Sequence, residues 1–143
     1  MTINDSWLLE SARKKKAASK TAPLLKARLE AVFDAEIDGL WNALRAEIQR
    51  EAAVYTGALG VPDALIVTSA DDEIDVRAAD GRRLILQLDR KRRALIERYR
   101  DRAGMVRVGR PRVKFSVNTA GRLAFSFGAV QAAAGSVLRR LIG

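Results

Sequence analysis

Residues 73–88 read EIDVRAADGRRLILQL, and this stretch decides the fold. Apolar and polar residues alternate on both sides of Asp80 and Gly81, which is typical of a β-hairpin with one buried face. We expect a three-residue loop over residues 79–81, with Gly81 in the left-handed conformation that glycine adopts without steric cost.

The register of this hairpin follows from its apolar residues. The three-residue loop places Val76 opposite Leu84 and Ile74 opposite Leu86, so that all four lie on one face. A two-residue loop would instead pair Ile74 with Gln87. Because a shift by one residue moves the apolar side chains to the other face, the pattern favours the first register.

The same register has a consequence for charge. On the polar face it places Arg77 directly opposite Arg83. Opposed like charges destabilise a hairpin unless an acid or a bound anion lies between them. Asp75 and Asp89 are the nearest candidate acids, so the alternatives are a surface network of ion pairs and an anion site.

Outward from this hairpin, several short segments alternate with period two and are joined by short turns. They lie at residues 65–69, 73–78, 82–88, 94–100, 112–117 and 122–127, with 105–108 as an extra candidate. Short connections favour antiparallel neighbours. We therefore expect an α+β fold with a long N-terminal helix, an antiparallel meander of five to seven strands and a C-terminal helix packed on the sheet.

A helical pattern precedes the strands, with apolar residues every three or four positions between Pro23 and Gly57. A helix over 22–57 is on the order of 50 Å long, whereas a domain of this size has a radius of gyration of only ~14 Å. The helix therefore overhangs the body, folds back on the N-terminal segment, lies across the sheet as a core helix, or buries its apolar stripe against a second copy. As an interaction surface, the stripe comprises Phe33, Ile37, Leu40, Trp41, Leu44, Ile48 and Tyr55.

The C-terminal part repeats the hairpin design and adds a closing helix. Residues 118–121 form the turn, and a second helix over 129–142 follows. The inward residues of this hairpin are Val113, Phe115, Val117, Leu123, Phe125 and Phe127. We expect them to form the firmest part of the core. The chain is thus divided into a basic arm at 1–20 and a single domain at 21–143.

The arm carries four consecutive cations, Arg13, Lys14, Lys15 and Lys16. Such a run is typical of polyanion-binding patches, and equally of a solvated, frayed terminus. Peripheral membrane contact is a third interpretation, which we disfavour because the adjacent apolar cluster, residues 7–9, is short.

Charge is segregated along the chain of 143 residues, which has a formal net charge of +9. Residues 30–80 hold 12 acids against three Arg, whereas residues 81–114 hold 13 Lys and Arg against three acids. These blocks either neutralise each other within the fold or leave the basic block free for an anionic partner.

The basic block predicts an anion-binding surface on its strands. The candidate residues are Arg90, Arg92, Arg93, Arg98 and Arg100, assisted by the arm at Arg13, Lys14, Lys15 and Lys16. Arg98 and Arg100 share one strand face, ~6.6 Å apart. Only Tyr99 interleaves with them, and it points to the other face of a regular strand, so base stacking is not supported.

The composition argues against catalysis, since the chain has neither His nor Cys and therefore no imidazole base and no thiolate. Asp71, Asp72, Glu73 and Asp75 lack the glycine and terminal glutamate of a calcium loop, so we expect a turn and no metal or cofactor. Neither a membrane-spanning run nor a signal peptide is evident, and we expect a cytoplasmic protein. The sequence favours a non-catalytic interaction module, self-associating or docking on a protein partner through the long helix, with sequence-independent binding of nucleic acid or another polyanion as the alternative.

Overall fold

The computed structural model describes residues 6–109, 114–126 and 128–142, and it has an α+β fold. Five strands form an antiparallel meander in the order β1-β2-β3-β4-β5, and two further strands form a separate hairpin, β6-β7. The elements in chain order are α1 (Ser6–Leu59), β1 (Leu65–Ala70), β2 (Glu73–Ala78), β3 (Arg83–Asp89), β4 (Ala94–Arg100), β5 (Val106–Gly109), β6 (Phe115–Val117), β7 (Leu123–Phe125) and α2 (Val130–Ile142). The expected fold class is confirmed.

The β2-β3 hairpin has the register that its apolar pattern predicts. Val76 pairs with Leu84 and Ile74 pairs with Leu86, and all four side chains are buried. Gly81 adopts a φ of 95°, in the region that favours glycine. The hydrophobic pattern and the turn residue therefore act together to fix this part of the sheet.

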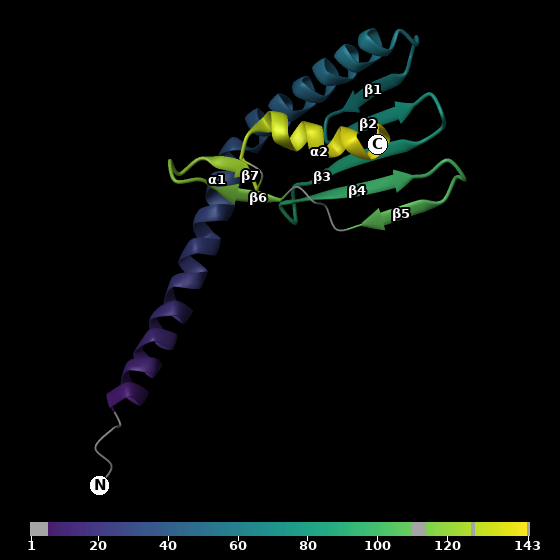
Figure 1. Ribbon diagram of the computed structural model, residues 1–143. Helices are drawn as coiled ribbons and strands as arrows, with labels where there is room; N and C mark the ends of the chain where they lie inside the picture. Colours follow the sequence, from purple (N-terminus) through teal and green to yellow (C-terminus); the bar gives the residue numbers. More distant parts are fainter. Residues whose placement is uncertain (1–5, 110–113, 127, 143) are drawn as a thin grey trace.

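Helix α1 begins at Ser6 and not near residue 22, so residues 6–20 of the basic arm are helical and continue into the rest of the helix. Ala, Leu, Lys and Arg are strong helix formers and dominate this segment, which accounts for the longer helix. The N-terminal half of α1 projects away from the rest of the molecule, and its C-terminal half runs beside β1 (Figure 1). The N-terminal half of α1 therefore overhangs the body, and its C-terminal half is a core helix. Both arrangements are among those expected from the sequence.

The core lies between the two helices and one face of the five-stranded sheet. The buried stripe of α1 packs against α2, β1 and the β6-β7 hairpin, α2 packs against β3, and the buried apolar residues of β2 and β3 belong to the same cluster. The turn between β1 and β2 is fastened to α1, because the indole nitrogen of Trp41 donates a hydrogen bond to the carbonyl of Asp71 at 2.8 Å. The guanidinium of Arg45 donates to the carbonyls of Ala70 and Asp71.

The β6-β7 hairpin packs on α1 at the edge of this core. Phe115 pairs with Phe125 across the hairpin, and its ring meets Phe33 of α1 edge-on at 5.1 Å between centroids. Leu123 and Phe125 are buried, whereas Phe115 and Val117 are only half-buried. The hairpin thus closes one end of the core and is not its centre; the expected inward residues Val113 and Phe127 lie outside the described residues.

Candidate anion-binding site

The second face of the five-stranded sheet, here called the outer face, is not covered by either helix. Alternation along the strands places Ile74 and Val76 toward the helices, so their neighbours in sequence point to the outer face. Ile66 on β1 and Val106 and Val108 on β5 are 42–68% exposed there. The outer face is therefore open on the strands at both edges.

Three arginines lie side by side on the three middle strands of this face, at the end next to the β2-β3 turn. Arg77 on β2 is directly opposite Arg83 on β3, as expected from the sequence, and Arg83 is directly opposite Arg100 on β4. Neighbouring strands are about 4.8 Å apart, so three like charges occupy a row about 10 Å wide. Directly opposed like charges oppose strand pairing, and this row contains two such pairs.

Among the described residues, one carboxylate forms ion pairs with this row: Asp75, which lies two residues before Arg77 on the same face of β2. It accepts two hydrogen bonds from Arg83, at 3.0 and 2.6 Å, and lies 3.5 Å from a nitrogen of Arg77. The Asp75 hydrogen bonds raise the pKa of Arg83 above its ordinary value, which keeps the guanidinium charged. Asp75 is 6% exposed because the guanidinium groups cover it. Within the described part of the chain, Arg100 has no carboxylate within 4.0 Å.

The row opens into a hollow of about 220 Å³ beside the β2-β3 turn. Its walls include Arg77, Arg82, Arg83 and Arg100, with Ala78 and Gly81. We define the arginine cluster as the four arginines of this hollow together with two adjacent arginines. Its members are Arg77, Arg82, Arg83, Arg98, Arg100 and Arg102. All six cations of the cluster are arginine.

A second acid, Asp80, holds the rim of the cluster together. It bridges Arg82 at 2.8 Å and Arg102 at 3.1 Å. The backbone N–H of Arg82 and the two guanidinium groups hold the pKa of Asp80 below its usual range. The ion pairs of the cluster involve two acids and four of its six arginines, which leaves an excess of positive charge at this end of the sheet.

The expected anion-binding residues are not brought together, because the acids of α1 engage two of them. Arg93 donates hydrogen bonds to Asp34 at 3.0 and 2.8 Å, and these lower the pKa of Asp34. Arg90 lies 2.8 Å from Asp38 and 3.0 Å from Asp72. The acidic block thus neutralises part of the basic block within the fold.

The remaining cations of that expected set lie in three places. Arg92 is 80% exposed at the β3-β4 turn, while Arg98 and Arg100 lie on the outer face within the arginine cluster. Arg13, Lys14 and Lys15 are exposed on the projecting half of α1; the side chain of Lys16 is outside the described residues. The projecting half and the arginine cluster lie at opposite ends of the sheet (Figure 1), so the arm does not extend the cluster.

The expected interaction stripe of α1 is turned toward the interior of its own chain. Its members Phe33, Ile37, Trp41, Leu44 and Ile48 are 0–3% exposed, and Leu40 and Tyr55 are half-buried against the same core. The large apolar side chains that α1 does expose include Leu8, Leu9, Leu24 and Leu25, all in the projecting half, at 50–71%.

Arg82 and Arg102 were not singled out from the sequence as anion-binding residues. The sequence feature that could have pointed to them is Asp80. It pairs with Arg82 two residues away and with Arg102 across the next hairpin. The acids at 71–75 form no metal-ligand cluster within the described residues, since Asp72 and Asp75 are engaged by arginines.

In the part of the chain that the structure describes, no helix is long and apolar enough to cross a membrane. Comparison of the chain with protein-family models, with curated proteins and with solved structures gave no match.

Proposed function

We propose that the chain is a non-catalytic binding module that holds the phosphate backbone of a nucleic acid on the arginine cluster. The observation that carries this proposal is the row of Arg77, Arg83 and Arg100, three opposed cations of which Arg77 and Arg83 share one carboxylate, Asp75. Such a row opposes strand pairing in the free protein, and a bound polyanion relieves that repulsion. The site therefore gains stability from its ligand.

The residue type of the cluster supports phosphate as the ligand group. A guanidinium presents a planar fork of N–H donors that matches two phosphate oxygens, whereas a lysine ammonium is a single point charge. Arg98 and Arg100 are two residues apart on one strand face, ~6.6 Å, and the row crosses three strands at right angles to that direction. The cluster is thus wide enough to contact two or three phosphates of one backbone.

The outer face does not offer the groups that read bases. Tyr99 lies on the inner face, opposite Arg107, and the outward positions of β1 to β5 carry no aromatic residue. Stacking on aromatic side chains is the usual means by which a sheet recognises single-stranded bases. We therefore expect binding that depends on charge and not on sequence.

Binding is favoured over catalysis by the chemistry of the cluster. The chain has no His or Cys, and the two carboxylates of the cluster accept hydrogen bonds from arginines. Asp80 is a poor proton acceptor, because the backbone N–H of Arg82 and its two arginine partners hold its pKa below the usual range.

Fluorescence anisotropy with labelled 20-mer DNA, single-stranded and duplex and of two unrelated sequences, tests the proposal. We expect dissociation constants of about 1–100 μM with no preference between sequences, and a log-log slope on salt of about −2 to −3 for duplex DNA. The variant R77Q/R100Q should lose about two units of this slope. The matched control R92Q/R139Q removes the same charge from exposed sites elsewhere and should keep most of the affinity.

Two outcomes would contradict the proposal. One is absence of binding to either form of DNA at about 50 mM salt, where charge screening is weak. The other is an equal loss of affinity in both double variants, because this would mean that net charge alone, and not the arginine cluster, determines binding.

Assembly through α1 is a second candidate, supported by the exposed leucines of its projecting half. Leu24 and Leu25 are 71% and 61% exposed on a helix that extends beyond the body. We propose that, if the chain self-associates, this half pairs with the same half of a second copy, because the stripe between Phe33 and Tyr55 is already packed. Light scattering should then give a dimer mass that falls to a monomer mass in L24Q/L25Q. A monomer mass for the unaltered chain would rule this candidate out.

A further inference from the structure

A second cavity lies on the inner face of the sheet, away from the arginine cluster. It has a volume of about 440 Å³ and is lined by Tyr99, Arg107, Val108 and Arg140. Helix α2 covers the middle of the inner face, and this cavity lies where that cover ends, between the last turn of α2 and the edge strand β5. A volume of about 300–1,000 Å³ is typical of small-molecule sites.

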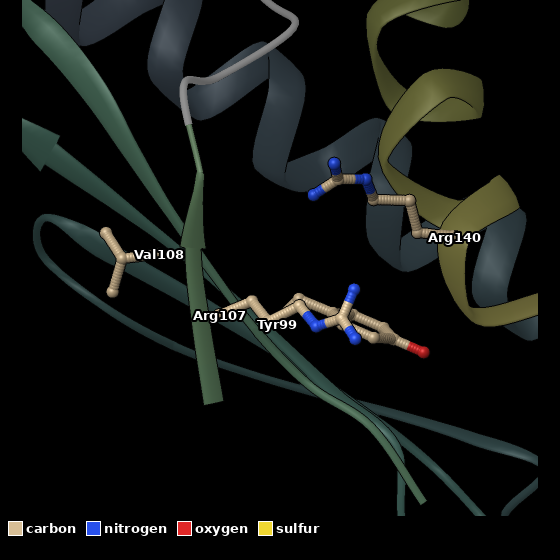
Figure 2. A pocket seen from close by; sticks show the side chains of 4 residues that line it. All are labelled: Tyr99, Arg107, Val108 and Arg140. Carbon is tan, nitrogen blue, oxygen red and sulfur yellow. The ribbon is translucent and has the colours of Figure 1, made fainter. Parts of the chain in front are cut away.

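The residues that line the cavity come from three elements, β4, β5 and α2. Tyr99 and Arg107 are directly opposite each other on β4 and β5 and point to the same side of the sheet. Figure 2 shows them side by side, with Arg140 extending from α2 above them and Val108 pointing to the other side of β5. The cavity therefore combines an aromatic ring with two guanidinium groups, and most of its exposed wall is carbon.

The charges of the side chains that line the cavity determine which ligand charge it fits. Arg140 donates a hydrogen bond of 2.6 Å to Glu97, which is 5% exposed, so this carboxylate neutralises Arg140. Arg107 forms no ion pair with any described residue. One cation is left over beside an apolar wall, and this combination fits a ligand with one negative charge and an apolar body.

We propose that this cavity binds a small amphipathic monocarboxylate. Its carboxylate would lie between Arg107 and Arg140, and its apolar part would lie against the ring of Tyr99. The site is independent of the nucleic-acid site, because Arg107 faces α2 whereas Arg77 and Arg100 face the opposite side of the sheet.

Isothermal titration calorimetry with octanoate tests this proposal. The octanoate concentration reaches about 1 mM, because a dissociation constant of about 1 mM is the weak end of specific small-molecule binding. Octan-1-ol and octyltrimethylammonium serve as the neutral and cationic probes of equal chain length. We expect octanoate to bind and the other two probes to bind at least about 10-fold more weakly. R107Q should weaken octanoate binding by about 10- to 100-fold, because it removes a charged hydrogen-bond donor. Arg107 is exposed, so this variant should fold, and circular dichroism checks that it does.

The control R139Q removes a charge from the exposed side of α2, and R77Q/R100Q removes two from the outer face. Both should bind octanoate as the unaltered chain does, which separates this proposal from the nucleic-acid proposal. Absence of octanoate binding would overturn the proposal. Equal binding of octan-1-ol, or unchanged affinity in R107Q, would also overturn it.

Discussion

Replacement of Trp41 by alanine tests whether the apolar stripe of α1 belongs to the core of a single chain. Trp41 is 1% exposed, and its indole donates a hydrogen bond to the carbonyl of Asp71, which also accepts one from Arg45 at 2.6 Å. The carbonyl keeps a partner in W41A, so the cost comes mainly from the cavity. Truncation of a buried aromatic residue costs about 3–5 kcal/mol. We expect the free energy of unfolding to fall by about 4 kcal/mol.

Urea unfolding followed by far-UV circular dichroism measures this change, since the substitution removes one of only two tryptophans. At an m value of roughly 2 kcal/mol/M, the midpoint should fall by about 2 M. The control is L24A on the same helix, where the side chain is 71% exposed and the effect should stay within about 0.5 kcal/mol. If W41A lost less than about 1 kcal/mol and changed the mass from dimer to monomer, Trp41 would lie in an interface between chains and the reasoning would be refuted.

Three further predictions concern charged groups. R100Q should raise the free energy of unfolding by about 0.2–1 kcal/mol in low salt, because it removes one opposed charge from the row, and urea unfolding at ~1 M NaCl should show that the gain disappears. The pKa of Asp34 is lowered by its hydrogen bonds from Arg93, so the stabilisation that this pair contributes is present at neutral pH and is lost as the pH falls through the lowered pKa; NMR titration should show the pKa rising toward 3.8 in R93Q. E97L or R140L alone should cost about 3 kcal/mol by leaving one charge of a largely buried pair without its partner, whereas E97L/R140L should cost less than either in the same urea experiment.

Local patterns were enough to predict the β2-β3 hairpin and the charge opposition that it creates. A period of two along the strands and a glycine in the turn determine that Val76 meets Leu84, and the same register places Arg77 opposite Arg83. Both inferences use residues fewer than ten positions apart. The alternation of buried and exposed positions then extends to the whole sheet.

The third member of the row could not be predicted in the same way. The position of Arg100 opposite Arg83 depends on the β3-β4 turn, in which Arg93 has a φ of 52°. A left-handed arginine has no sequence signal, because glycine and asparagine are the residues usually found in that conformation.

Distance along the chain limited the prediction of the remaining ion pairs. Arg93 pairs with Asp34 across 59 residues, and Arg122 pairs with Glu36 across 86 residues. Segment charges indicate that such neutralisation is available, but only the packing of α1 against the sheet decides which cations it reaches. Most of the arginine cluster lies on the face of the sheet that α1 does not cover.

Arginine side-chain NMR during a titration with duplex DNA tests the central claim most directly, because it reports on each guanidinium separately. We predict that the Nε–Hε signals of Arg77, Arg83 and Arg100 shift in proportion to bound DNA, while that of Arg93, paired with Asp34, stays in place. Shifts confined to Arg13 on α1, with the signals of the row unchanged, would contradict the claim that the outer face of the sheet holds the nucleic acid.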